Sequence, residues 1–244
     1  MTLERRQAPA HLRCMIDIRP FNSLGHADHG WLNARHHFSF ATYHDPDRMA
    51  WGRIRVWNDD QIAAQSGFPP HPHRDMEIVT YVRTGAITHQ DSMGNKGRTA
   101  AGDVQVMSAG TGVVHAEYNL EDEQTTLFQI WIETDNPSAQ PSWGAMPFPK
   151  DSREGAFQLL ASGDPGDGTL TINADARVLG ATIKSGDSIA VDADADRHLY
   201  LVPSGRIRVN GVEASPRDGV AITGENRIQI EAEDDAELVL VDAR

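Results

Sequence analysis

The sequence predicts an all-β protein made of two small barrels or sandwiches, with few short helices. Short runs of alternating apolar and polar residues recur along the whole chain, separated by Gly, Pro, Asn and Asp, which is the pattern of strands and turns. The runs follow one another at about 8–12 residues, a spacing typical of sandwiches and barrels. The chain has 244 residues, and because one average domain takes about 100–150, two domains fit.

In the first half, each alternating run ends at turn residues. The expected strands are Ile54–Trp57, Glu77–Arg83, Ala86–Gln90, Val104–Ser108 and Thr126–Glu133. The segments 91–97 and 100–103 are expected turns, since they are rich in Gly, Asp and Asn. A helix of about two turns is expected over Asp59–Gln65, because Asn58 or Asp59 can cap it.

A proline-rich stretch separates the two halves. Residues 136–149 read NPSAQPSWGAMPFP and show no usable periodicity, so they are expected to link a domain of residues 1–135 to one of residues 150–244. Asn210-Gly211 is a strong hairpin signal in the second domain. The strands expected there are Ala156–Ala161, Leu170–Ile172, Ala176–Ile183, Ser188–Val191, His198–Pro203, Arg206–Val209, Val220–Thr223, Ile228–Ala232 and Glu237–Asp242.

Composition excludes several classes of protein. The net charge is −13 and no run of Lys or Arg occurs, which argues against direct binding to nucleic acid or to an anionic membrane. No apolar run approaches the ~20 residues of a membrane-spanning helix. The single cysteine, Cys14, excludes an internal disulfide. Because the N-terminal segment MTLERRQAPAHLR also lacks an apolar signal region, a cytoplasmic location is expected.

The histidines are unevenly distributed, with ten of the eleven between His11 and His115. In the string HPHRDME, His71 and His73 are two residues apart, so on a strand both side chains point to one face. The same parity would place Glu77 on that face. Because Pro72 is tolerated at the edge or start of a strand, an entry position is favoured over mid-strand.

A second pair, His115 and Glu117, has the same spacing and follows the flexible Gly110-Thr111-Gly112. Together the two strings supply three imidazoles and one or two carboxylates. Such a mixed set suits Fe(II), Mn, Ni, Cu or Zn rather than Mg or Ca. From the residues alone, Glu77 and Glu117 are both candidates for the fourth ligand.

The other histidines have simpler interpretations. His26, His29, His36, His37 and His44 alternate with aromatic residues and are expected to pack rather than to bind metal. His89 lies near a hairpin and is expected to be a hydrogen-bonding residue. The second half has one histidine, His198, so no metal is expected there.

Several strings together resemble a known family. Gly67, HPHRDME and Gly85 resemble the first cupin motif, and Gly102, Gly110 and His115-x₃-Asn119 resemble the second, with two extra residues before the histidine. More narrowly, residues 20–135 resemble the pirin family. The strings that carry this resemblance are GHADHGWL at 25–32, HFSFA at 37–41, HPHRDME at 71–77, QDSMG at 90–94 and MSAGTGVVHAEYN at 107–119. Beyond Lys150, the resemblance is to the layout of a second cupin barrel.

The resemblance implies two cupin (jelly-roll-like) barrels packed face to face, with one divalent transition metal in the N-terminal barrel only. Fe(II) is expected first, with Ni, Cu, Mn or Zn as alternatives. Carried over residue by residue, the implied ligands are His71, His73, His115 and Glu117. In many cupins the ligand is instead the glutamate of the first motif, here Glu77. With Glu117 as the ligand, Glu77 is expected to orient a ligand or a water.

The resemblance also implies a function. Pirin-like bacterial proteins of this kind resemble quercetinases, which use O₂ to cleave flavonols such as quercetin and release carbon monoxide. The expected partners are thus a small planar aromatic substrate and O₂, with Glu117 or Glu77 accepting the proton of the flavonol 3-hydroxyl. The alternative is a non-enzymatic regulator that binds a transcription factor or a metabolic enzyme. A metal site open to a ligand-sized cavity would favour catalysis.

Overall fold

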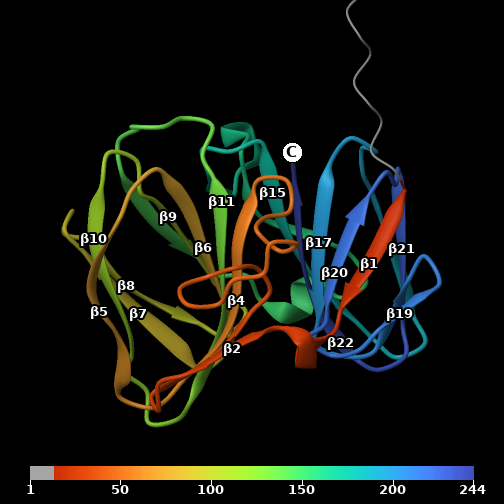
Figure 1. The fold of residues 1–244 in the computed structure, drawn as a ribbon, viewed down its shortest axis with the longest axis horizontal. Coiled ribbons are helices and arrows are strands. Elements are labelled where there is room, and N and C mark those ends of the chain that lie inside the picture. The colour runs from red at the N-terminus through yellow and green to blue at the C-terminus, as the bar shows by residue number, and fades with distance from the viewer. Residues whose placement is uncertain (1–13) are drawn as a thin grey trace, which may run out of the picture.

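Two β-barrels lie side by side in the computed structural model, which describes residues 14–244 (Figure 1). The prediction of an all-β fold of two cupin barrels is confirmed. The N-terminal segment, on which the prediction of a cytoplasmic location partly depends, lies outside the described residues, and so does His11. The helices of the described part are three short 3₁₀ turns, η1 (Phe21–Ser23), η2 (Lys150–Arg153) and η3 (Pro165–Asp167), and none is long and apolar enough to cross a bilayer.

The N-terminal barrel is made of two sheets that enclose its interior. The outer sheet has the order β5-β10-β7-β8, with β5 (Ser66–His73), β10 (Val113–Asn119), β7 (Ala86–Asp91) and β8 (Lys96–Ala100). The inner sheet has the order β12-β9-β6-β11-β4-β3-β2, with β12 (Ser142–Met146), β9 (Val104–Ser108), β6 (Met76–Thr84), β11 (Thr125–Glu133), β4 (Ile54–Ile62), β3 (Leu32–His36) and β2 (Gly25–Asp28).

The C-terminal barrel repeats this plan. Its outer sheet has the order β16-β21-β18-β19, with β16 (Ser188–Asp192), β21 (Arg227–Ala232), β18 (Ile207–Val209) and β19 (Val212–Ala214). Its inner sheet has the order β1-β20-β17-β22-β15-β13-β14, with β1 (Met15–Arg19), β20 (Gly219–Thr223), β17 (His198–Pro203), β22 (Ala236–Ala243), β15 (Ala176–Ile183), β13 (Gln158–Ser162) and β14 (Leu170–Thr171).

Two strands lie outside the simple division of the chain at residues 136–149. Strand β1 pairs with β20, so the first described strand completes the inner sheet of the C-terminal barrel, as its red colour in Figure 1 shows. Strand β12 falls within the expected linker, and it pairs with β9 of the N-terminal barrel. The division into residues 1–135, 136–149 and 150–244 therefore stays a proposal. In the structure β1, from the first segment, belongs to the C-terminal barrel, and β12, from the linker segment, belongs to the N-terminal barrel.

The helix expected over Asp59–Gln65 is wrong. Strand β4 continues through Ile62 and is paired on both sides, with β3 and with β11. Asp59 is a pairing residue of the sheet rather than a helix cap, and its carboxylate bonds Arg83 and Arg217 from opposite barrels. The two guanidinium groups compensate a fully buried carboxylate, an interaction that no local sequence pattern reveals.

The two inner sheets pack against each other through one shared apolar core. It takes residues from both barrels, including Trp57, Val79 and Ile130 from the first and Val178 and Val239 from the second, all at most 1% exposed. Alternate residues of each inner strand face this core, while the residues between them face the interior of their own barrel.

The two barrel interiors differ. The C-terminal barrel is filled by a continuous apolar cluster that draws on both of its sheets. In the N-terminal barrel, the apolar residues form two smaller clusters. On β11, the buried Gln129 lies between Leu127 of one cluster and Trp131, which packs on the other. Thr80 lies in the same way between Ile78 and Val82 on β6. A polar layer thus crosses the N-terminal barrel.

Candidate metal centre

The candidate site is built on the outer sheet of the N-terminal barrel, where β5 and β10 pair. His71 and His73 lie at the end of β5, an edge strand, where Pro72 removes no ladder hydrogen bond from a central strand. On β10, burial alternates from residue to residue, so His115 and Glu117 face the interior while the exposed Val114 faces solvent. His115 stands directly opposite His71 in the ladder.

The three histidines converge. One ring nitrogen from each of His71, His73 and His115 lies within 4.8 Å of the others. The Nε2 atoms of His71 and His115 are 3.0 Å apart, and the Nδ1 atom of His71 lies 2.8 Å from the carbonyl oxygen of Pro69. That carbonyl can only accept, so the proton of a neutral His71 lies on Nδ1 and its Nε2 presents a lone pair.

Burial keeps the rings of His73 and His115 neutral. It lowers the pKa of His73 to about 4, with a further contribution from the nearby His71. It also lowers the pKa of His115 to about 3, and the neighbouring His71, His73 and His89 add to this effect. At neutral pH both rings therefore carry lone pairs without the cost of removing a proton, as metal ligation requires.

This donor set fits a divalent transition metal. Two nitrogens that each lie about 2.1 Å from one ion and meet at a right angle are about 3 Å apart. That separation matches the one between the Nε2 atoms of His71 and His115. When both Nε2 atoms present lone pairs, as ligation requires, the two lone pairs repel each other at this distance and a cation between them relieves the repulsion. Imidazole is a ligand that these metals favour.

Glu117 lies below the histidines in the polar layer. Its carboxylate accepts hydrogen bonds from Gln105 and Gln129, each at 2.7 Å, and from Thr80 at 3.3 Å. A carboxylate oxygen of Glu117 lies within 4.8 Å of ring nitrogens of His115 and His89, but Glu117 is not within that distance of the full set of three histidines. Burial raises the pKa of Glu117 to about 7, against the opposing effect of its three hydrogen bonds.

The structure does not bring Glu77 to this cluster. The chain turns after His73 at Arg74 and Asp75, where Asp75 adopts a φ of 48°, so the parity of β5 does not continue into β6. The Glu77 side chain accepts hydrogen bonds from Ser108 of its own barrel and from Asn173 of the other. The expectation that Glu77 lies on the metal face is therefore wrong, because it assumed one continuous strand.

Most of the remaining histidines lie elsewhere. Within residues 14–244, neither group of side chains able to hold a metal includes His26, His29, His36, His37 or His44. The buried His36 bonds Asn58 at 2.8 Å, and the buried His37 bonds the Tyr200 hydroxyl of the other barrel at 2.9 Å. His89 does form the expected hydrogen bond, to Asp91, but it also contacts the cluster through His115.

Sequence reasoning missed several residues of the site, most of them on β9 and β11 of the inner sheet. Gln105 and Gln129 hold Glu117, and Trp131 packs edge-on against His73 with ring centroids 4.9 Å apart. The spacing of His89 and Asp91 on β7 is the same i, i+2 signal that singled out His71 and His73, and it could have indicated that both point inward.

One hollow borders the histidine cluster, and another has in its wall Trp131, which contacts His73. The first, of ≈ 450 Å³, is lined by His73 together with Pro72, Arg74, Ser92 and residues 112–114. The second, of ≈ 300 Å³, reaches none of the three histidines and has a mixed lining that includes the apolar Phe40 and Met76 and the polar His44 and Arg55. Small-molecule sites occupy about 300–1,000 Å³ and are mostly apolar with a few polar groups. The histidine cluster is therefore next to space of the right size and character for a ligand.

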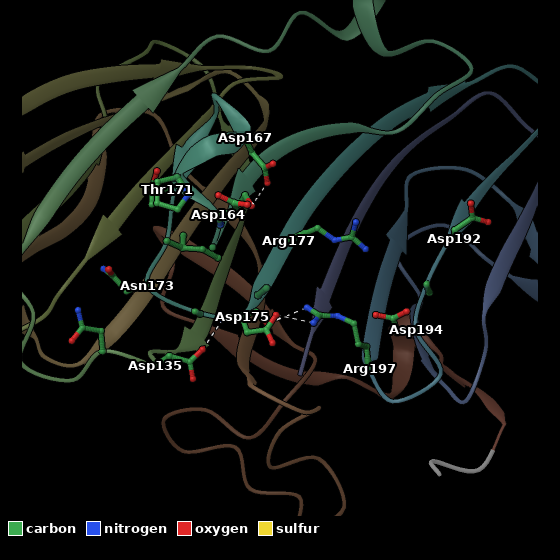
Figure 2. Close-up of a pocket in the computed structure, with 18 residues that line it drawn as sticks. Asp135, Asp164, Asp167, Thr171, Asn173, Asp175, Arg177, Asp192, Asp194 and Arg197 are labelled. Atoms are coloured by element: carbon green, nitrogen blue, oxygen red, sulfur yellow. Dashed lines mark hydrogen bonds and ion pairs between the residues drawn. The ribbon is translucent and has the colours of Figure 1, made fainter. Parts of the chain in front are cut away.

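A third hollow, of ≈ 940 Å³, lies away from the histidines and is lined by several aspartates and two arginines (Figure 2). Both of its arginines are paired within the protein. Arg197 bonds Asp175 at 2.7 Å, and both Arg177 and Arg197 bond Asp242. Within residues 14–244, no group of side chains able to hold a metal includes an aspartate of this hollow, so the histidine cluster remains the candidate centre.

Comparison with known proteins agrees with this geometry. Residues 17–132 match the family model described as Pirin, and residues 159–243 match the model described as Quercetinase C-terminal cupin domain. The chain is 62% identical to a pirin-like protein of Caulobacter vibrioides over 231 residues, covering 94% of this chain and 100% of the relative. It is 44% identical to a quercetin 2,3-dioxygenase of Escherichia coli over 230 residues, covering 93% and 98%. The crystal structure of the bacterial pirin YhhW from Escherichia coli in complex with nickel(II) superposes with a TM-score of 0.88 at 42% identity, covering 94% of this chain and 99% of the other.

Proposed function

The chain belongs to the pirin family, and from that premise we propose that it is a metal-dependent dioxygenase that cleaves flavonols such as quercetin with O₂ and releases carbon monoxide. The observation that carries this proposal is a cluster of three histidines, one of which, His73, lines a ligand-sized hollow. The name of the Escherichia coli relative, quercetin 2,3-dioxygenase, supports the same chemistry.

In this proposal one divalent transition metal is held by His71, His73, His115 and Glu117. Fe(II) comes first, and Ni, Cu, Mn or Zn are alternatives that the same ligand types accept. When bound, the ion would supply Lewis-acid chemistry, polarising the 3-hydroxyl and 4-keto oxygens of a flavonol.

The protein's own residues would orient the substrate. Trp131 contacts His73 on one side and Phe40 on the other, with ring centroids 4.9 and 5.4 Å apart and both pairs edge to face. These rings, with Met76 and Met49, form an apolar wall that suits the flat face of an aromatic ligand. A flavonol bound there would have its oxygens near the histidines and its ring system in the hollow.

Glu117 would accept the proton of the 3-hydroxyl. A general base works best when its pKa lies near the operating pH, and burial raises the pKa of Glu117 to about 7. Gln105 and Gln129 hold its two oxygens in place, one on each. Without these bonds the carboxylate could rotate away from the histidines.

The alternative, a non-enzymatic regulator, would require a site that is closed to small molecules. Here His73 lines an open hollow, which favours catalysis. Among the described residues, no surface next to the cluster carries a feature that specifies a protein partner.

The test is release of carbon monoxide. Iron-reconstituted protein incubated with quercetin in air should produce carbon monoxide in step with the loss of flavonol absorbance. His73→Ala should abolish both metal retention and turnover, because it removes a ligand and the contact with Trp131. His29→Ala, which removes an exposed histidine of the same barrel, should retain both.

Two results would contradict the proposal. One is the absence of carbon monoxide with the Fe, Mn, Ni and Cu forms alike. The other is undiminished turnover by a His73→Ala protein shown to be free of metal.

A further inference from the structure

A chain of polar contacts leads away from the histidine cluster along β10 and β7. His115 directs Nε2 toward His71, and its other ring nitrogen, Nδ1, lies 3.4 Å from Nδ1 of His89. The Nε2 atom of His89 lies 3.1 Å from a carboxylate oxygen of Asp91. His115, His89 and Asp91 are all at most 9% exposed, so water does not replace these contacts.

The positions of the protons in this chain follow from its two ends. Asp91 accepts hydrogen bonds from the backbone nitrogens of Met93 and Asn95 and from the Asn95 side chain, as an ionised carboxylate does. His89 must then carry its proton on Nε2, which leaves Nδ1 as an acceptor. His115 can donate to that acceptor only from Nδ1, and this leaves the lone pair of its Nε2 free to face the other histidines.

The ring of His89 is also held in orientation. The indole of Trp143 stacks on it with ring centroids 4.9 Å apart and an interplanar angle of 10°. Trp143 comes from β12, within the segment that the sequence analysis took for a linker. Gly97, which pairs with His89 in the ladder, provides room for the indole, because a Cβ at that position would overlap the Trp143 ring.

We propose that His89, held by Asp91 and Trp143, is a positioning residue that fixes the tautomer and orientation of the metal ligand His115. A histidine ligand commonly donates its second ring N–H to a carboxylate or a carbonyl, and such partners affect metal affinity about 10–100-fold. Here a second imidazole stands between the ligand and the carboxylate. The inference depends on the proposed metal centre but not on the reaction carried out there.

The same contacts allow a competing arrangement, in which His89, His115 and Glu117 hold a second ion. The proposed centre with His71 and His73 already takes His115 and Glu117 as ligands. A second ion would therefore share both of them and have only His89 to itself. In the positioning arrangement, each ring nitrogen has one partner. His89 donates from Nε2 to Asp91 and accepts at Nδ1 from Nδ1 of His115, and Nε2 of His115 is left for the metal.

The test reads metal binding rather than turnover, so its failure is distinguishable from failure of the proposed reaction. Full-length protein is loaded with Co(II), and the dissociation constant is measured by competition with a chelator, together with the visible ligand-field spectrum and the bound stoichiometry. His89→Phe keeps a ring against Trp143 but removes both nitrogens. It should weaken Co(II) binding about 10–100-fold and shift the spectrum.

Three further variants isolate the effect. His89→Gln retains a carbonyl acceptor and should bind Co(II) more tightly than His89→Phe. Asp91→Asn should weaken binding in the same direction, and the double variant should be no weaker than His89→Phe alone, because Asp91 acts through His89. His36→Phe, the same exchange at another buried histidine of this barrel, should leave Co(II) affinity and spectrum unchanged.

Several outcomes would overturn the inference. Wild-type affinity and spectrum in a folded His89→Phe protein would show that the contact does not act on the metal. If the fold-losses of Co(II) affinity in the His89 and Asp91 variants multiplied in the double variant, Asp91 would not act through His89. Two bound equivalents of Co(II) in the wild type, falling to one in His89→Phe, would make His89 a ligand.

Discussion

Among single residues, Glu77 and Glu117 show most clearly what the sequence could and could not predict. Both are buried glutamates that follow a histidine of the site by a few residues. Strand parity gave the correct face for Glu117, because β10 runs without a break through His115 and Glu117. It gave the wrong face for Glu77, because the left-handed Asp75 ends β5. A reversal of this kind depends on one backbone angle, and local composition does not reveal it.

Glu117 should give metal binding its pH dependence near neutrality. Its pKa is about 7, so below that pH a proton competes with the metal, and affinity should fall as pH is lowered through 7 and level off above it. His73 and His115, with pKa values of about 4 and 3, are already neutral across this range. Co(II) titrations between pH 5.5 and 8 would measure the effect.

Glu117→Gln should reduce this dependence and bind Co(II) more weakly, whereas Glu77→Gln should keep the wild-type profile. The reverse pattern, with the dependence lost in Glu77→Gln and retained in Glu117→Gln, would return the fourth-ligand role to Glu77.

Among elements, the strands were predicted best where both sheet faces are buried and worst where polar residues are satisfied by distant partners. Val104–Ser108 and Ala176–Ile183 were predicted with the bounds that β9 and β15 have. Strand β12 was missed because prolines surround it and its largest apolar residue, Trp143, packs against nothing nearby in sequence. Its indole instead crosses to β7 and β8, where His89 and Gly97 form a flat slot.

The slot makes Gly97 sensitive to substitution. Gly97→Ala should displace the indole of Trp143 and lower the free energy of unfolding by about 1–3 kcal/mol, the usual cost of overpacking. Gly144→Ala, on β12 itself, meets only an ordinary contact with Leu170 and should change stability by less than about 0.5 kcal/mol. Urea unfolding of the two variants would measure both effects, and equal costs would argue against the slot.

In the whole molecule, the shared core between the two inner sheets makes one folding unit of the two barrels. Trp57 and Ile130 from one barrel and Tyr200 and Val239 from the other belong to one apolar cluster. If the two inner sheets separated, each would expose this apolar face to water and lose the stabilisation that its burial provides. Local patterns predicted two barrels, but which faces meet depends on contacts between residues far apart in the chain, and only the family resemblance implied them.

Calorimetry should therefore record one transition, with equal calorimetric and van't Hoff enthalpies. Ile130→Ala removes a fully buried side chain from the shared core and should cost about 2–5 kcal/mol while the transition stays single. Val212→Ala, at an exposed position of the outer sheet, should cost less than about 0.5 kcal/mol. Two separate transitions, with only one moved by Ile130→Ala, would show that the barrels fold independently.

The placement of β1 has a consequence for synthesis on the ribosome. The backbone nitrogen of Phe21, just after β1, bonds the Asp218 carboxylate just before β20, and the two residues are 197 positions apart. At about 5–20 residues per second, the first strand waits roughly 10–40 s for its partner to be translated. During that interval the nascent chain carries an unpaired strand with two isoleucines, Ile16 and Ile18, that are half-buried in the finished fold. The C-terminal barrel therefore closes only after β20 has been translated.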